Sequence, residues 1–308
     1  MTEASHQFEQ IVSMVEPRAK LIRHWQLNGG ISCTMTGIQI EHVDSSMETL
    51  VVRKVGQWSF ENYSESVRNE YELLRYLSEC GIPVATPKYF DLSCNILDRP
   101  YLVLNYVEGS PDLVTDDRTK RVTNMADHLA KVHSVDIRHS AMEFMEPSPL
   151  RIRPSNEPLN EALQETKIRT ALELNFSTVR ENPYTFRHGD YWPGNMVWQS
   201  GDLAAIIDWE ETSIGDPLFD VAIARLDILW AYGVEAMNTF TAVYQARMDL
   251  DYTYLPYWDL RISLRPISNI VEWSTSFPQL DRPDVTAETM SDGHRWFVDQ
   301  ALNLLGEA

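Results

Sequence analysis

Turn-forming and polar residues near position 190 lie just before two short apolar runs, and this arrangement limits the fold more than any other feature. Residues 188–195 read HGDYWPGN. The apolar runs 196–198 and 203–207 are joined by the polar, glycine-containing residues 200–202, a pattern that predicts a β-hairpin. Such a hairpin places Asn195, at the start of one strand, close to Asp208, directly after the other. The sequence therefore predicts acid and amide groups gathered on one hairpin.

Asp190, Asn195 and Asp208 are the residue types that phosphoryl transfer needs at this spacing. In kinases an Asp accepts a hydroxyl proton, while an Asn five residues later and an Asp further on hold magnesium. Taken singly, each residue also fits an ordinary turn, where Asp, Asn, Gly and Pro are common. The downstream run 214–220, IGDPLFD, favours the chemical interpretation.

The motifs HGDxxxxN, IDWE and GDPxxD, in this order, resemble the aminoglycoside phosphotransferase family. That family is related to choline kinase and more distantly to protein kinases, and it transfers the ATP γ-phosphate to hydroxyl groups of small molecules. The resemblance covers roughly residues 15–300. It implies an α+β, two-lobed protein-kinase-like fold, with an antiparallel-sheet N-lobe over 1–107, a helical C-lobe over 108–308, and ATP between them.

The resemblance also implies a role for each motif residue. Asp190 is expected to be the catalytic base, and Asn195 and Asp208 are expected to bind Mg²⁺. Asp220 is expected to brace the catalytic loop. Asp216 precedes a proline and an apolar run, so we expect a structural role for it as a helix N-cap.

Glycines near the N-terminus are expected to contact the nucleotide. The strand patterns 20–27 and 34–42 flank a turn that contains Gly29, Gly30 and Ser32. The resemblance implies that this turn covers the ATP phosphates, where missing side chains let backbone N–H groups approach the anion. Without the resemblance, the same residues would indicate only a tight hairpin.

Two neighbouring cations in the next strand, Arg53 and Lys54, compete for the phosphates. Side chains alternate along a strand, so only one of them can face the nucleotide. The resemblance favours Arg53, with Lys54 as the alternative. Glu70, on a predicted helix over 64–80, is expected to orient the chosen cation, although a solvent-exposed helix Glu is an equal alternative.

A strand over 100–104 leads into the predicted hinge between the lobes. There the backbone groups of Asn105 and Val107 are expected to pair with adenine. Beyond the hinge, a helix over 123–135, a helical region over 160–179 and the chain after Asp220 read as a helical lobe.

Composition limits the partners. The 308 residues have an ordinary apolar fraction of 44% and a net charge of −19, which disfavours nucleic acid and anionic membranes. Residues at the N-terminus lack a basic-then-apolar signal, and the chain has no long apolar run, so a cytoplasmic protein is expected. The charge weakly favours a cationic acceptor, for which the candidate carboxylates are Glu210, Glu211, Asp227, Asp259 and Glu272.

We therefore expect an ATP- and Mg²⁺-dependent phosphotransferase whose small-molecule hydroxyl acceptor is an aminoglycoside or another cationic alcohol. The main alternative is a nucleotide-binding pseudokinase that acts through a partner, but no member of the motif set is lost. A protein kinase is disfavoured because Gly189 replaces the Arg that pairs with a phosphorylated activation loop, and because few residues separate Asp208 from Asp216.

Overall fold

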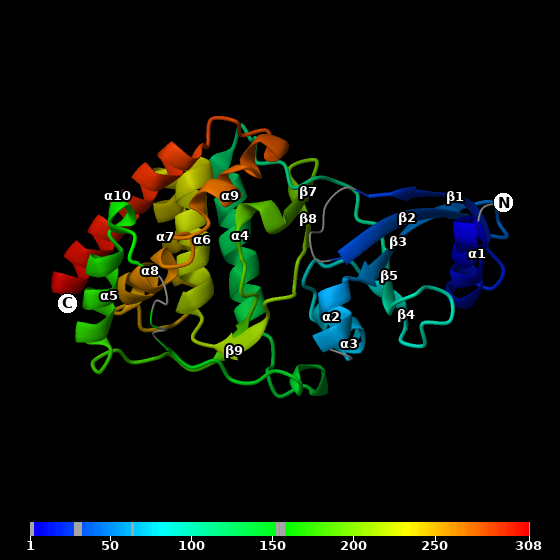
Figure 1. Cartoon of the computed structure of the whole chain (residues 1–308), viewed down its shortest axis with the longest axis horizontal. Coiled ribbons are helices and arrows are strands. Elements are labelled where there is room, and N and C mark those ends of the chain that lie inside the picture. Colours follow the sequence, from blue (N-terminus) through cyan, green and yellow to red (C-terminus); the bar gives the residue numbers. More distant parts are fainter. Residues whose placement is uncertain (1–2, 28–32, 63–64, 152–153, 155–157, 308) are drawn as a thin grey trace. The chain divides into compact units, whose positions relative to one another are not determined.

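The computed structural model describes residues 3–27, 33–62, 65–151, 154 and 158–307, which form two compact units (Figure 1). Unit 1 comprises Met1–Glu108 and Ser140–Phe144, and unit 2 comprises Gly109–His139 and Met145–Ala308. Unit 1 is built on a β-sheet and unit 2 is mainly helical. The predicted α+β class is confirmed.

The sheet of unit 1 is antiparallel and has the strand order β1-β2-β3-β5-β4. Its strands are β1 (Lys20–Gln26), β2 (Cys33–Glu41), β3 (Met47–Val55), β4 (Pro87–Asp91) and β5 (Tyr101–Asn105). The register between β2 and β3 places Arg53 opposite Met35, and β5 places Leu102 on the other side of Arg53. Arg53 therefore lies in the central strand of the sheet.

The two faces of this sheet carry different residues. One face packs against α1 (Glu3–Val15) in a buried apolar cluster that includes Phe8, Ile11, Ile38, Ile40, Leu50 and Val52. Because side chains alternate along β3, Arg53 points to the face opposite Leu50 and Val52. The helix α3 (Ser66–Glu79) lies against β4 and β5, and it supplies the partner of Arg53 described below.

The helix α3 follows the periodicity of its sequence. Val67, Leu73, Leu74 and Leu77 are buried along one side, and Gly81, with φ +74°, follows the helix end. The prediction of a helix over 64–80 is confirmed. The short helix α2 (Gln57–Asn62) and strand β4 were not predicted.

The central helix of unit 2 is α6 (Leu218–Tyr232), which contacts α7 (Val234–Arg247), α8 (Leu255–Ser263) and α10 (Ala287–Glu307) (Figure 1). Nearly all of its side chains are buried, as expected of a helix enclosed by others. The remaining helical segments are α4 (Arg118–His133), α5 (Glu165–Asn175), α9 (Ile270–Ser274), and the 3₁₀ turns η1 (Ser140–Met142, in unit 1), η2 (Glu161–Leu163), η3 (Pro193–Asn195) and η4 (Phe277–Leu280).

Two small antiparallel pairs of strands precede α6 in the sequence. The first joins β6 (Thr185–Arg187) to β9 (Ser213–Gly215), and the second is the hairpin of β7 (Met196–Gln199) and β8 (Asp202–Ile206). At the hairpin turn, Ser200 and Gly201 both have positive φ, at 53° and 84°, as a tight two-residue turn requires. The predicted hairpin is confirmed.

Within the described part of the chain, no helix is both long and apolar enough to cross a membrane.

Candidate active site

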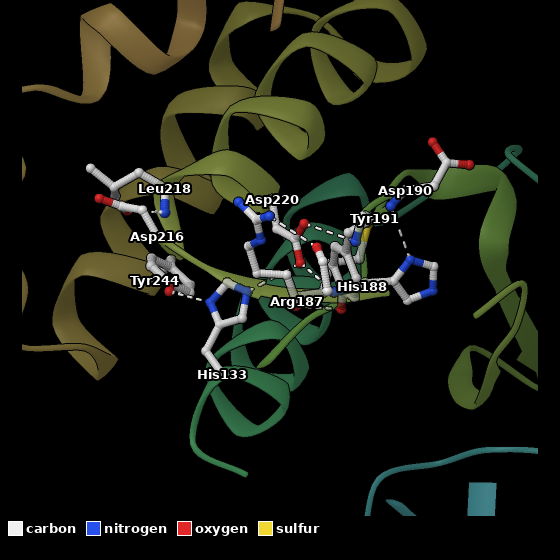
Figure 2. A network of polar contacts seen from close by, with 12 residues as sticks. His133, Arg187, His188, Asp190, Tyr191, Asp216, Leu218, Asp220 and Tyr244 are labelled. Atoms are coloured by element: carbon white, nitrogen blue, oxygen red, sulfur yellow. Dashed lines mark hydrogen bonds and ion pairs between the residues drawn. The ribbon is translucent and has the colours of Figure 1, made fainter. Parts of the chain in front are cut away.

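Asp220, in the first turn of α6, holds the loop that follows β6. Its side chain is fully buried and accepts hydrogen bonds from the backbone N–H groups of His188, at 2.7 Å, and Gly189, at 3.0 Å. His133 of α4 lies 3.2 Å from the same carboxylate through Nε2, and its Nδ1 lies 2.6 Å from the hydroxyl of Tyr244 (Figure 2). The loop is therefore attached to both α6 and α4.

The environment of Asp220 keeps it ionised. Burial raises the pKa of this carboxyl. The hydrogen bond with His133 and the nearby charge of Arg187 lower the pKa by more than burial raises it, so the pKa lies below its ordinary value. Its position in the first turn of α6 also places the negative charge at the positive end of the helix dipole.

Gly189 is required by the shape of this loop. Its φ is +86°, which L-residues with side chains rarely adopt. A Cβ atom at this position would come 2.1 Å from the carbonyl oxygen of Glu211. The residue before Asp190 therefore has to be glycine, for a steric reason that the sequence alone did not reveal.

Asp190 and Asn195 are in direct contact. Asn195 Nδ2 donates to the backbone carbonyl of Asp190 at 2.9 Å and to its Oδ2 at 3.1 Å. Figure 2 shows the Asp190 carboxylate pointing away from the Asp220 network. The Asp190 side chain is 30% exposed, so a small molecule can reach it.

Ile207 brings Asp208 to the same place. Its N–H donates to the carbonyl of Asn195 at 3.0 Å, and its carbonyl accepts from His188 Nε2 at 3.0 Å. The backbone N–H and carbonyl of Ile207 are thus both bound by residues of the 188–195 loop. Asp208 itself is exposed and has φ +65°. The structure brings the three motif residues Asp190, Asn195 and Asp208 together, as the hairpin pattern predicts.

His188 serves this geometry as a neutral imidazole. Its Nδ1 accepts from the N–H of Asp190 at 3.2 Å while Nε2 donates to Ile207, which requires one proton on the ring. Burial lowers the pKa of His188 and outweighs the raising effect of Asp220 and Asp190. The ring also packs against Trp209, with centroids 4.5 Å apart.

In unit 1, Arg53 forms an ion pair with Glu70 of α3. Its neighbour Lys54 pairs instead with Asp98, at 2.7 Å. The two cations thus have different acidic partners, and Arg53 has the one that the kinase-like arrangement predicts.

The structure describes only some of the other residues expected to bind the nucleotide. Gly29, Gly30 and Ser32 lie outside the described residues. The N–H of Asn105 donates to the carbonyl of Thr86 at 2.9 Å, so this donor is already used within the sheet. Val107 is half-buried in the segment that follows β5.

Two other acidic residues have structural roles. Asp216 accepts from the N–H groups of Leu218, at 2.8 Å, and Asn182, at 2.7 Å, so the expectation of a structural residue before α6 is confirmed. Asp259 is fully buried and pairs with Arg225 of α6 at 2.9 Å. The expectation that Asp259 helps to bind an acceptor ammonium group is wrong, because a guanidinium group already neutralises it inside the helical core.

Comparison with known proteins identifies the family. The sequence profile of the phosphotransferase enzyme family matches residues 40–254. The chain belongs to this family. It is 25% identical over 195 residues to acyl-CoA dehydrogenase family member 10 of Mus musculus, a match that covers 58% of this chain. The chain spans between 18% and 32% of the lengths of the curated relatives that it matches.

Solved structures of phosphotransferases share the fold. Spectinomycin phosphotransferase, in complex with ADP and spectinomycin, has a TM-score of 0.61 and 12% identity, over 97% of this chain and 98% of that one. Choline kinase from Streptococcus pneumoniae has a TM-score of 0.54 and 15% identity, over 100% of both chains. The resemblance and the kinase-like fold that the motifs predict are confirmed.

Several polar residues at this candidate site carry no sequence signal that we recognised. Arg187, directly before the HGD motif, is buried, donates to Ser213 Oγ at 2.9 Å, and lies over the ring of Phe219. Tyr244 contacts Nδ1 of His133 through its hydroxyl group. Arg265 donates to Asp190 itself, at 3.1 Å. His133 is also buried, and it contacts the Asp220 carboxylate.

Proposed function

We propose that this chain transfers the γ-phosphoryl group of ATP to a hydroxyl group of a small molecule in a magnesium-dependent reaction. The observation that carries the proposal is the placement of Asp190, Asn195 and Asp208. Asn195 contacts Asp190 through its side chain and Ile207 through its backbone carbonyl, and Asp208 comes next in the chain. One carboxylate base and two oxygen ligands on a single loop and hairpin suit in-line phosphoryl transfer.

In this proposal Asp190 is the general base. A partly exposed carboxylate can meet the acceptor hydroxyl, and the donors on its oxygens orient it. The bonds from Asp220 to the backbone of His188 and Gly189 keep the preceding residues in place. Catalysis then depends on positioning and charge neutralisation rather than on a covalent intermediate.

Asn195 and Asp208 would hold Mg²⁺. The donor set fits this ion, since magnesium prefers oxygen and is commonly bound by one or two carboxylates together with substrate phosphates and water. Asn195 uses its amide nitrogen on Asp190, which leaves its side-chain oxygen as the metal ligand. Bound magnesium would neutralise charge on the β- and γ-phosphates.

The nucleotide would be held by groups of unit 1. We propose that Arg53, oriented by Glu70, binds the α- and β-phosphates, and that Lys54 is the weaker candidate because it pairs with Asp98. Gly29, Gly30 and Ser32 would cover the phosphates. The N–H of Asn105 already donates to the carbonyl of Thr86. We therefore propose that adenine is bound by the carbonyl of Asn105 and the N–H of Val107.

The acceptor would be a small hydroxylated molecule, such as an aminoglycoside or another cationic alcohol. Spectinomycin and choline, named for two neighbours in fold, are examples of such compounds. Of the carboxylates proposed to attract an ammonium group, Glu210 and Glu272 are exposed. Asp227 is half-buried, and burial raises its pKa to about 8, so it is mainly protonated at neutral pH and contributes little to this attraction. The net charge of −19 adds a general attraction for cations.

An ATP-consumption screen tests this function. The panel contains aminoglycosides, amino alcohols, macrolides and neutral sugars, each measured with magnesium and with magnesium removed by a chelator. We expect magnesium-dependent ADP formation with at least one acceptor and a phosphate ester in its ³¹P NMR spectrum. Magnesium-ATP binding without consumption on any acceptor would favour the pseudokinase alternative instead.

A further inference from the structure

Arg265 contacts the proposed base from a distant part of the chain. Its Nη2 atom donates to Asp190 Oδ1 at 3.1 Å and to Glu211 Oε2 at 3.3 Å. Arg265 is 75 residues from Asp190 in the sequence and lies between α8 and α9. One guanidinium group therefore joins the catalytic loop, the segment after Asp208 and the helical part of unit 2.

The two carboxylate oxygens of Asp190 have different donors. Asn195 Nδ2 donates to Oδ2, and Arg265 Nη2 donates to Oδ1. The terminal torsion of an Asp side chain is broad, so a single donor leaves the carboxylate plane free to turn. Donors on both oxygens fix that plane, while each oxygen keeps a further lone pair with which to accept a hydroxyl proton.

Arg265 is itself well anchored. Its backbone N–H donates to the carbonyl of Ile262 at 2.8 Å. The carbonyl of the next residue, Ser263, lies 2.8 Å from Nε2 of His294 in α10. The guanidinium lies 5.9 Å from the ring centroid of Trp273, and the side chain is only 21% exposed. A guanidinium stays charged at every accessible pH and has a rigid, planar set of donors, so Arg265 can hold a carboxylate in one orientation.

Charge around the base gives Arg265 a second effect. Asp227 of α6 interacts electrostatically with both Asp190 and Arg265. The guanidinium adds a positive charge directly beside the Asp190 carboxylate. The contact with Glu211 contributes less, because the Glu211 side chain is 64% exposed and exposed ion pairs typically contribute about 0–1 kcal/mol.

We propose that Arg265 is a positioning residue for phosphoryl transfer, which holds the Asp190 carboxylate so that one oxygen faces the acceptor hydroxyl. The inference rests on the proposed function, because it takes Asp190 as the base. Loss of Arg265 should therefore impair the chemical step and spare the binding of magnesium-ATP. Within the described residues, Arg265 donates hydrogen bonds to Asp190 and Glu211 and not to the proposed magnesium ligands Asn195 and Asp208.

The first test compares kinetic constants on the acceptor found in the screen. Arg265→Met should lower kcat by a factor on the order of 10 to 100, the effect of a misplaced catalytic group, while the Kd for magnesium-ATP and the KM for the acceptor stay near wild type. Arg265→Lys, which keeps the charge, should recover part of the loss. Added guanidinium ions should raise the turnover of Arg265→Ala.

Arg247→Met is the matched control. Arg247 also donates to an aspartate, Asp127, at 2.7 Å, but at the surface of unit 2 with 55% exposure of its side chain. Its turnover should equal that of the wild type. Thermal unfolding of all variants checks that they are folded, and if Arg265→Met is unfolded, Arg265→Lys and the guanidinium experiment carry the test.

A double-mutant cycle separates positioning from a merely structural role. Once Asp190 is replaced by Asn, removing Arg265 should cost no further turnover, so the two effects are strongly non-additive. Additive effects, a wild-type kcat in Arg265→Met, or a raised acceptor KM with unchanged kcat would each overturn the inference. If the wild-type chain phosphorylates no acceptor, the proposed function is wrong, and the inference falls with it. If the wild type is active and the Arg265 variants behave in one of these contrary ways, only the inference is wrong.

Discussion

Asp220 and Asp227 lie on the same helix, yet their surroundings affect their charge in opposite ways. Asp220 receives two backbone N–H groups and a contact from His133, and its pKa lies below its ordinary value. Asp227 has no such donors in the described structure. Burial, together with the neighbouring charge of Asp190, raises the pKa of Asp227 to about 8, and Arg265 opposes this shift only in part. At neutral pH the helix therefore carries one ionised and one protonated carboxyl group.

The raised pKa of Asp227 predicts how stability depends on pH. Between about pH 4 and pH 8 the folded state keeps a proton that the unfolded state has lost, so the contribution of Asp227 to stability falls as the pH rises through this window. Asp227→Asn cannot titrate and resembles the protonated form. The free energy of unfolding of the wild type, minus that of Asp227→Asn, should decrease from pH 5 to pH 8 in urea titrations. A difference that stays constant, or increases, would contradict the assignment.

At the scale of secondary-structure elements, a buried ion pair ties the central helix to its neighbours. Arg225 of α6 donates to Asp259 of α8 through Nε, at 3.0 Å, and Nη2, at 2.9 Å, and to Thr241 of α7 at 2.6 Å. Gln300 of α10 donates to the same Asp259 at 3.1 Å. Four helices of unit 2 thus meet at one pair of charges.

Removing one member of this pair should be costly. Arg225→Met leaves the carboxylate of Asp259 buried without its cation, and we expect it to lower the free energy of unfolding by about 3–5 kcal/mol. The double variant Arg225→Met with Asp259→Leu should recover much of the loss, because no charge then remains buried. Denaturant titration of the three proteins checks this. A loss below about 1 kcal/mol in the single variant, the scale of an exposed pair, would show that the helices do not depend on this contact.

At the scale of the whole molecule, the sequence predicts the elements better than the contacts between them. Short apolar runs and turn residues are local, so they indicated the hairpin of β7 and β8, and the helical periodicity of α3 was equally clear. The predicted hairpin also explains why the motif residues Asp190, Asn195 and Asp208 lie close together. The short elements α2 and β4 lack a long enough pattern and were missed.

Contacts between distant segments could not be predicted in the same way. Asp259 looked like a free carboxylate because its cation, Arg225, is supplied by another helix, and the choice of helix partners depends on packing that no local pattern encodes. Arg265 reaches Asp190 across 75 residues for the same reason. The requirement for Gly189 depends on the carbonyl of Glu211, which becomes a neighbour only when β9 pairs with β6.

The most direct measurement of the central claim compares Asp190→Asn with Asp208→Asn in both phosphoryl transfer and magnesium-ATP binding. If Asp190 is the base, its variant should lose turnover by about 10²- to 10⁴-fold and bind magnesium-ATP almost as the wild type does, in isothermal titration. Asp208→Asn should instead weaken magnesium-ATP binding, because it removes a charged ligand of the metal. Wild-type turnover in Asp190→Asn, or unchanged magnesium-ATP affinity in Asp208→Asn, would contradict the account.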